Sequence, residues 1–356
     1  MTRSAICRHR LINQQLENAH CKTPGELVSW MGAIQAQDYE MAKWAIGIRV
    51  SASPGEVENA INRGEIIRTH ILRPTWHFVS PGDIRWLLRL SAPGLRAYMA
   101  PYWRKMELDE KIFKRSNKII LQALSGNKSL SREELLNKLR DKGIDPGNPM
   151  RSAHFMLRAE LEGLICNGPK RGKTFTYVLL EEKAGLGKTM PQEEALATLA
   201  NRYFSSHGCA TLQDFCWWSG LGVREAKTGL ELIKNGLDSA DFEKKTYWFR
   251  PAAFSGNQSD SVHFLPAFDE YLISYKDRSA SLDSGMMNRV ITSNGIFKPL
   301  ILFNGQVAGI WKKDSLKNQL LLQPMMRGFK NILPKQVLRE AADRYALYLG
   351  TKIRLV

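Results

Sequence analysis

The sequence predicts an α+β fold, helix-rich over residues 1–258 and strand-rich over residues 259–356. Two observations carry this prediction. Three helix starts of one type recur in the first part, each followed by a short apolar helix, a break and a second helix. Alternating apolar runs and two Asn-Gly dipeptides mark the second part. A chain of 356 residues is long enough for several compact modules.

Each helix start places a Ser or Thr three residues before an acidic residue, in the pairs Thr23–Glu26, Ser131–Glu134 and Thr211–Asp214. The hydroxyl can accept from the third backbone N–H, and the carboxylate favours the positive end of the helix dipole. Pro24 suits a first helical position, which needs no N–H donor. Breaks are predicted at 143–147 and 219–222, and near 32–38 in the first instance.

β-prone segments follow the helix pairs at residues 64–80, 164–180 and, more briefly, 242–251. A hairpin after a helix–turn–helix is a wing, although this helix pair is also a common packing unit. We interpret the chain as three tandem winged-helix modules, with boundaries at 1–105, 106–188 and 189–258. The remaining residues, 259–356, are predicted to form a small, β-rich, barrel-like domain with a helix at 334–349.

The composition points to a polyanionic partner. Lys and Arg total 51 against 35 acidic residues, a net charge of +16 that is absent only from residues 189–258. A basic surface favours nucleic acid, although a generically basic surface would explain the charge equally well. The five cysteines form no CxxC pair, and His207 near Cys209 and Cys216 is interpreted as a loop histidine beside core thiols. We expect no metal and no cofactor.

No apolar run reaches the length of a membrane span, and the first residues lack the apolar core of a signal peptide. We therefore expect a cytoplasmic protein that does not bind membranes.

Gln35 and Gln37 are the first candidate functional residues. In a helix, side chains two residues apart point about 200° from each other, whereas in an extended segment they point the same way. Asp38 is a suitable N-cap for a helix over 39–49, which puts both glutamines in the turn before it. Both amides could then address one water, base edge or phosphate. The alternative is two solvated amides near a cap.

Five stretches stand out in order along the chain: Ile34–Asp38 (IQAQD), Arg68–Val79 (RTHILRPTWHFV), Trp218–Leu221 (WSGL), His263–Leu272 with Asp277–Arg278 (HFLPAFDEYL…DR), and Asn304–Trp311 (NGQVAGIW). Together they resemble the motifs of the AlkZ-type DNA glycosylases, winged-helix enzymes that remove N7-alkylated purines and unhook interstrand crosslinks. Ile34–Asp38 resembles the family's QΦQ motif, and Gln37 places it nearer the QΦQ branch than the YcaQ-like branch, which has Asp there.

The resemblance implies a monofunctional DNA glycosylase of base excision repair, with Gln35 and Gln37 catalytic. Amides are neither acids nor bases, so they suffice only for a substrate that is already activated. An N7-alkylated purine is cationic and leaves as a neutral base, so the remaining task is to place a water against the sugar. The expected partner is duplex DNA with alkylated or crosslinked purines. The protein would be nucleoid-associated when bound to it.

A different class of protein, a winged-helix transcription regulator without catalytic activity, is the alternative. Regulators usually dimerise to read two half-sites. Three unlike modules in one chain instead suggest a monomer that wraps one site.

Further residues receive roles that each have a structural alternative. Arg49, Arg68 and Arg73 could line a duplex channel, and Lys170, Arg171 and Lys173 could clamp the DNA backbone from the second wing. Thr75 and His77 are also expected near DNA, with His77 alternatively a hydrogen-bonded structural residue. Asp269 could act as a carboxylate near the sugar. Its structural alternatives are to orient an arginine such as Arg278 or to cap the next turn. The Trp217–Trp218 pair is interpreted as helix core rather than a base-stacking platform.

Overall fold

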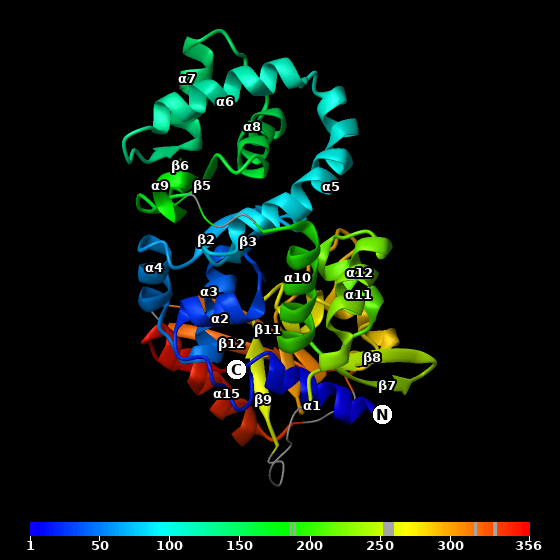
Figure 1. Cartoon of the computed structure of the whole chain (residues 1–356). Coiled ribbons are helices and arrows are strands. Elements are labelled where there is room, and N and C mark those ends of the chain that lie inside the picture. Colours follow the sequence, from blue (N-terminus) through cyan, green and yellow to red (C-terminus); the bar gives the residue numbers. More distant parts are fainter. Residues whose placement is uncertain (186, 188–189, 252–259, 317–318, 330–332) are drawn as a thin grey trace. The chain divides into compact units, whose positions relative to one another are not determined.

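The computed structural model describes residues 1–356 except 186, 188–189, 252–259, 317–318 and 330–332 (Figure 1). The chain divides into two compact units. The first unit contains Met1–Asn59, Leu196–Trp218 and Gly222–Val356. The second contains Ala60–Ala195 and Ser219–Leu221. Both units combine runs of helices with mainly antiparallel strands, so the predicted α+β class is confirmed. Among the described residues, no helix has the length and apolarity needed to cross a bilayer.

The N-terminal part of the first unit is mainly helical. Its elements are α1 (Arg3–Asn13), α2 (Pro24–Met31), β1 (Ile34–Gln35), α3 (Tyr39–Val50) and the start of α4 (Pro54–Asn62). The chain returns to this unit within α10 (Gln192–Ser206). It continues through α11 (Leu212–Ser219), α12 (Val223–Ile233), the short 3₁₀ turn Lys234–Gly236, and the hairpin β7 (Asp238–Phe242) and β8 (Lys245–Phe249).

The three predicted helix starts are confirmed. The Thr23 hydroxyl accepts from Glu26 N at 3.2 Å while Glu26 accepts from Thr23 N, which makes a capping box at α2 with Pro24 in its first turn. Ser131 and Glu134 repeat this arrangement at α7. Thr211 Oγ1 accepts from Asp214 N at 3.1 Å, and Asp214 Oδ2 accepts from Thr211 N at 2.9 Å, at the start of α11. Each first helix is thus specified by contacts within four residues.

The second unit opens with a hairpin of β2 (Ile67–Ile71) and β3 (Arg73–Val79), in the predicted place and with Thr69 opposite His77. The other elements follow in chain order: α5 (Ile84–Lys105), α6 (Glu110–Leu124), β4 (Leu130–Ser131), α7 (Arg132–Asp141), α8 (Pro149–Leu161), β5 (Ile165–Asn167), β6 (Thr176–Leu179) and α9 (Leu180–Ala184). Strands β4, β6 and β5 form a small sheet in that order, and they share one hydrophobic core with α6, α7 and α8.

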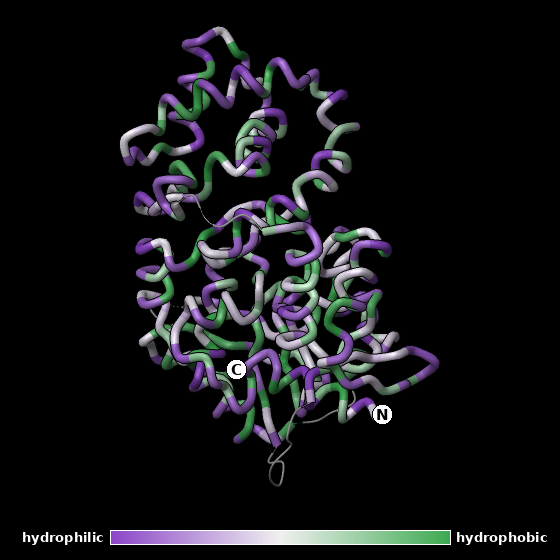
Figure 2. Tube along the Cα trace, viewed as in Figure 1, coloured by the Kyte–Doolittle hydropathy of each residue, from purple (hydrophilic) through white to green (hydrophobic). Residues whose placement is uncertain are grey.

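A five-stranded sheet forms the C-terminal part of the first unit. The strands are β9 (Val262–Leu265), β10 (Leu300–Phe303), β11 (Gln306–Leu316), β12 (Gln319–Met325) and β13 (Ile353–Leu355), in the order β13-β12-β11-β10-β9. All neighbours are antiparallel except β12 and β13. Helix α15 (Lys335–Leu349) packs on this sheet and on α3 through a buried cluster that includes Trp44, Trp311 and Tyr345. In the hydropathy view (Figure 2), β9 is largely hydrophobic, whereas the β7–β8 tip is hydrophilic. The predicted β-rich character of the C-terminal part is confirmed, although this part belongs to the same compact unit as the N-terminal helices.

Two segments of the predicted β-rich part are helical. After β9 the chain forms the short helix α13 (Glu270–Ile273), because the Asp269 carboxylate accepts from Tyr271 N at 2.9 Å and caps a helical turn. The 3₁₀ turn Ser284–Met286 and α14 (Met287–Val290) precede β10. Tyr271, Leu272 and Ile273 are all buried, so their apolar run carries no period that separates strand from helix.

The breaks predicted between helices are confirmed, since 143–147 lies between α7 and α8 and 219–222 lies at the α11–α12 junction. Helix α5 ends at Lys105, at the predicted first module boundary. The other two boundaries, 188/189 and 258/259, fall at residues outside those that the structure describes. The winged-helix interpretation and its boundaries stay predictions.

Candidate functional site

The loop 32–38 carries both glutamines and connects α2 to α3, as predicted. Gly32 has a φ of +75°, which allows the chain to leave α2 sharply. Ser29, in the last turn of α2, accepts from Arg202 Nη1 at 2.6 Å through its carbonyl oxygen. At the other end, Asp38 Oδ1 accepts from Met41 N at 3.1 Å and caps α3. Both ends of the loop are therefore fixed by named contacts.

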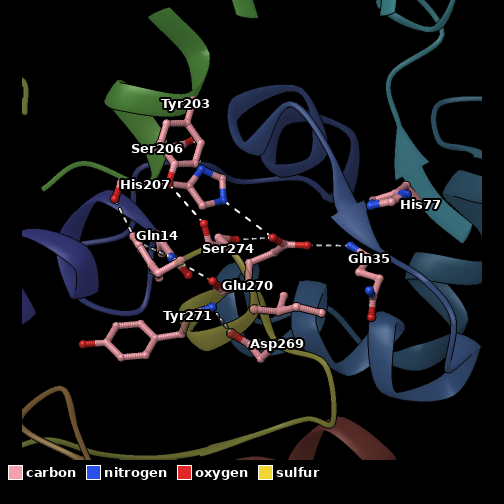
Figure 3. A network of polar contacts seen from close by, with 12 residues as sticks. Gln14, Gln35, His77, Tyr203, Ser206, His207, Asp269, Glu270, Tyr271 and Ser274 are labelled. Atoms are coloured by element: carbon pink, nitrogen blue, oxygen red, sulfur yellow. Dashed lines mark hydrogen bonds and ion pairs between the residues drawn. The ribbon is translucent and has the colours of Figure 1, made fainter. Parts of the chain in front are cut away.

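The middle of the loop is fixed by a residue 235 positions away. Gln35 N donates to Glu270 Oε1 at 2.6 Å (Figure 3). The Gln35 side chain points away from that carboxylate, and the residue is only 6% exposed. Its Oε1 is buried with no hydrogen-bond partner among the described residues. A buried, unsatisfied carbonyl oxygen is costly, and it can accept from one water or ligand donor.

Glu270 is itself buried and held on its second oxygen. Ser274 Oγ donates to Glu270 Oε2, and His207 Nε2 lies 3.8 Å from the same atom. His207 Nδ1 lies 2.8 Å from Ser206 Oγ, whose proton goes to Arg202 O, so Nδ1 is the donor of that contact. The ring also stacks on Tyr203 with centroids 5.0 Å apart. The hydrogen bonds from Gln35 N and Ser274 Oγ fix the orientation of the carboxylate.

Helix α13, which carries Glu270, is held by side chains from other helices. Gln14 Nε2 donates to Glu270 O at 3.3 Å, Tyr203 Oη donates to Ser274 O at 3.1 Å, and Trp217 Nε1 donates to Ile273 O at 2.8 Å. The donors come from the end of α1, from α10 and from α11. These contacts hold the short helix in place beside the glutamine loop. Figure 3 shows Gln14, Tyr203 and Ser274 among them.

Gln37 differs from Gln35 in its exposure. It lies in a bend, and its side chain reaches the surface, whereas Gln35 is buried. Both are carboxamides, which can accept and donate hydrogen bonds but cannot exchange protons as acids or bases near neutral pH. The loop thus presents one exposed amide and one buried carbonyl oxygen on a fixed backbone. Such an arrangement can orient a small polar molecule, but it cannot protonate a leaving group.

Arg49, predicted to line a DNA channel, is buried and fully engaged. Its Nη2 donates to Asp269 Oδ1 at 2.8 Å and its Nη1 to Asp269 Oδ2 at 2.9 Å, while Nε donates to Gln14 O at 2.8 Å. This burial favours a structural role for Arg49, and its contact with DNA stays a prediction. Asp269 orients an arginine and caps α13, which were its structural alternatives, but the arginine is Arg49 rather than Arg278.

Arg68 and His77 are buried in the second unit. Arg68 Nη1 donates to Asn167 Oδ1 at 2.6 Å, and its guanidinium lies 4.2 Å from the centre of the Trp76 ring. His77 Nδ1 lies 2.9 Å from Thr75 O and therefore donates to it, which leaves Nε2 to accept from Arg73 Nη2 at 3.4 Å. Because Arg68 and His77 are buried, a structural, hydrogen-bonded role is favoured for both over direct contact with DNA. Arg73 and Thr75 are half-buried.

The basic residues of the second wing lie near or at the surface. Lys173 and Arg171 are exposed, and Arg171 pairs with Glu134 on α7. Lys170 is half-buried, with its ammonium 5.3 Å from the centre of the Phe175 ring. A phosphate could reach all of them.

The remaining predicted residues lie beside α13. Arg278 donates to Leu272 O at 3.1 Å and lies against the Trp217 and Phe297 rings. Trp218 is buried as predicted, whereas Trp217 is 42% exposed and so only partly fits the core interpretation.

Comparison with known proteins decides the family. The profile of the family described as DNA glycosylase AlkZ-like matches residues 28–348. The chain belongs to this family. It is therefore a DNA glycosylase, as the motifs predicted, and the alternative of a regulator without catalytic activity is not supported.

One curated relative of this glycosylase is the interstrand DNA cross-link repair glycosylase of Streptomyces sahachiroi. It is 24% identical over 341 residues, which cover 88% of each chain. The solved structure of Streptomyces sahachiroi DNA glycosylase AlkZ superposes with a TM-score of 0.84 at 20% identity and covers 100% of both chains. The glycosylase therefore has the AlkZ fold.

Sequence reasoning missed Glu270 and His207 as parts of this site. Glu270 lies inside a motif that matches the family, but nothing local shows that its carboxylate faces Gln35. His207 stands out in the sequence only for its neighbouring cysteines. In the structure its Nε2 lies 3.8 Å from the carboxylate of the buried Glu270.

Proposed function

We propose that this glycosylase hydrolyses the N-glycosidic bond of cationic N7-alkylated purines in duplex DNA, including those joined in interstrand crosslinks, with Gln35 and Gln37 positioning the attacking water. The name of the Streptomyces sahachiroi relative supports the crosslinked substrate. The observation that carries the proposal is the loop itself, in which a buried amide carbonyl without a partner and an exposed amide stand two residues apart on a fixed backbone.

The chemistry follows from what an amide can do. The C1′–N9 bond breaks with both electrons going to the purine, which neutralises the positive charge that alkylation gave it. Water then bonds to C1′ and loses a proton to solvent. No acid is required for the leaving group, and amide oxygens can accept from the water and stabilise positive charge at the sugar. Gln37, the exposed residue, contacts the water most directly, and Gln35 offers the second acceptor.

The test uses duplexes with one N7-methylguanine or one N7–N7 crosslink, and mild alkali to convert abasic sites into breaks. We expect breaks with the wild type, a loss of about a hundredfold or more in rate for Gln37→Ala and for the double variant with Gln35→Ala, and nearly unchanged DNA binding. Gln336→Ala, an exposed amide on α15, is the matched control. Excision that persists in the double variant, or equally fast release of the neutral base uracil, would overturn the proposal.

The partner and the setting follow from this substrate. We expect a monomer that acts on cytoplasmic DNA and associates with the nucleoid when bound. A sizing measurement that shows an obligate dimer would contradict the monomer.

A further inference from the structure

We propose that Glu270 is a positioning residue for this reaction, because its buried carboxylate fixes the main chain of Gln35 and with it the loop that presents Gln37. This inference rests on the proposed function of the two glutamines. It adds a residue from a distant part of the chain, whose contribution is made through Gln35 and not by touching DNA.

Glu270 is not placed to act as a base. The residue is buried, and its two oxygens face Gln35 N, Ser274 Oγ and His207 Nε2. A general base must lie within hydrogen-bond reach of the water that it deprotonates. Figure 3 shows the carboxylate enclosed by these partners, with the Gln35 side chain directed away from it. Any effect on catalysis must therefore pass through the Gln35 backbone.

The contact has the properties of a strong anchor. It is a short, charge-assisted hydrogen bond of 2.6 Å to a backbone N–H in a buried position. The loop is tied near Gly32 and at Asp38, and Glu270 supplies the tie between them. Without it, the Gln35 N–H would be buried and unsatisfied, so the backbone would shift to find another partner. A shift of about 1 Å in a positioning group can cost about a hundredfold in rate.

The anchor itself is fixed by its own partners. Ser274 holds the second oxygen, and Gln14 and Tyr203 hold the backbone of α13 at Glu270 O and Ser274 O. Because these donors come from different helices, the position of the carboxylate is set by the core of the first unit. The core of the first unit therefore also determines the geometry of the glutamine loop.

Replacement by glutamine separates hydrogen bonding from charge. In a Glu270→Gln variant, the amide oxygen can still accept from Gln35 N. The amide nitrogen would face Ser274 Oγ and His207 Nε2, which both can accept, since His207 uses Nδ1 to donate to Ser206. The isosteric variant thus keeps these contacts, whereas Glu270→Ala removes the tie. A positioning role predicts that glutamine rescues the function that alanine destroys.

The kinetic experiment measures single-turnover excision of N7-methylguanine at saturating enzyme, and Kd for the same duplex, with full-length protein. We expect Glu270→Ala to lower the rate about tenfold to a hundredfold while Kd stays within about threefold, and Glu270→Gln to stay within about threefold of wild type in both. Tyr271→Phe is the matched control, since the Tyr271 hydroxyl lies on the same short helix and donates to Gly305 O at 2.8 Å, but contacts neither the carboxylate nor the side chains that hold it. It should leave the rate within about threefold of wild type.

A second measurement does not depend on excision. Amide hydrogen exchange of a peptide covering residues 33–38 should be faster in Glu270→Ala, and unchanged in Glu270→Gln and Tyr271→Phe. If the wild type excises nothing, the proposed function fails, while exchange still decides whether Glu270 anchors the loop. Unchanged exchange in Glu270→Ala overturns the inference. So does a wild-type rate in that variant, or an equal loss of rate in the alanine and glutamine variants.

Discussion

The guanidinium of Arg49 holds both carboxylate oxygens of Asp269, at 2.8 and 2.9 Å, with the two side chains 1% and 0% exposed. Arg49 lies in the last turn of α3, the helix that follows the glutamine loop, and Asp269 caps the short helix that carries Glu270. The Arg49–Asp269 ion pair is therefore a second contact, besides Gln35–Glu270, between the segment 35–49 and the start of α13.

Breaking this pair should destabilise the protein strongly. Arg49→Met leaves the Asp269 carboxylate buried without its countercharge, and we expect a loss of about 3–5 kcal/mol in the free energy of unfolding, measured in urea. The control is Arg63→Met, which breaks an ion pair with Glu65 whose side chains are 60% and 46% exposed, and it should leave the free energy of unfolding nearly unchanged. An Arg49→Met variant of normal stability that has lost DNA affinity would restore the predicted role in DNA contact.

The two Asn-Gly turns offer a matched pair of glycines. Gly305 has a φ of +77° and Gly295 a φ of +78°, so alanine is strained at either position. A Cβ on Gly305 would also lie 2.6 Å from Tyr271 Oη and 2.7 Å from Cys7 Cβ, whereas nothing lies within 4 Å of one on Gly295. We expect Gly295→Ala to cost about 1–2 kcal/mol and Gly305→Ala about 1–3 kcal/mol more, by thermal unfolding. Equal losses would show that the Gly305 site relaxes freely.

His263 gives the stability a defined pH dependence. Burial, with Arg344 and Arg49 nearby, lowers the pKa of His263 from 6.5 to about 3. Between about pH 6.5 and pH 3, His263 is therefore protonated in the unfolded chain but neutral in the folded chain. This residue makes the free energy of unfolding fall as the pH drops through that window, by up to about 1.4 kcal/mol per pH unit. His263→Leu should lose less stability than wild type between pH 7 and pH 5.5 in urea titrations.

Burial lowers the pKa of His9 to about 4. His9 therefore contributes a pH dependence of the same sign to the stability of the wild type and of His263→Leu. The surface variant His20→Gln is the control and should keep the wild-type slope. Identical slopes in wild type and His263→Leu would refute the assignment.

The second wing is the part of the predicted DNA surface that stays exposed. Lys173→Ala and Arg171→Ala should weaken duplex binding to a similar degree for every sequence and reduce the slope of log K against log salt by about 0.9 for each phosphate that is no longer neutralised. The single-turnover rate at saturating enzyme should not change. Lys335→Ala, on an exposed residue at the start of α15, is the control. Salt slopes equal to that of the wild type would remove this wing from the interface.

The N-capping residues show why parts of the fold were predictable. Thr23, Ser131, Thr211 and Asp38 each satisfy backbone donors within three residues, so sequence spacing alone specifies where α2, α7, α11 and α3 begin. The short helix at 270–273 was not predictable because its apolar residues are all buried and carry no period. The burial of the arginines was not predictable because charge alone does not show it. Arg49 and Arg68 look like surface cations in the sequence but satisfy their donors inside the protein.

By itself the sequence determined the α+β class, the turn that holds Gln35 and Gln37, and the ordered motifs that placed the chain in its family. These are local properties, since caps, turns and motifs act over a few residues. Only the tertiary structure decided that Gln35 is buried and Gln37 exposed, that Arg49 pairs with Asp269, and that Glu270 holds the Gln35 backbone from 235 positions away. Such contacts depend on how distant segments pack, and residue spacing along the chain carries no record of that packing.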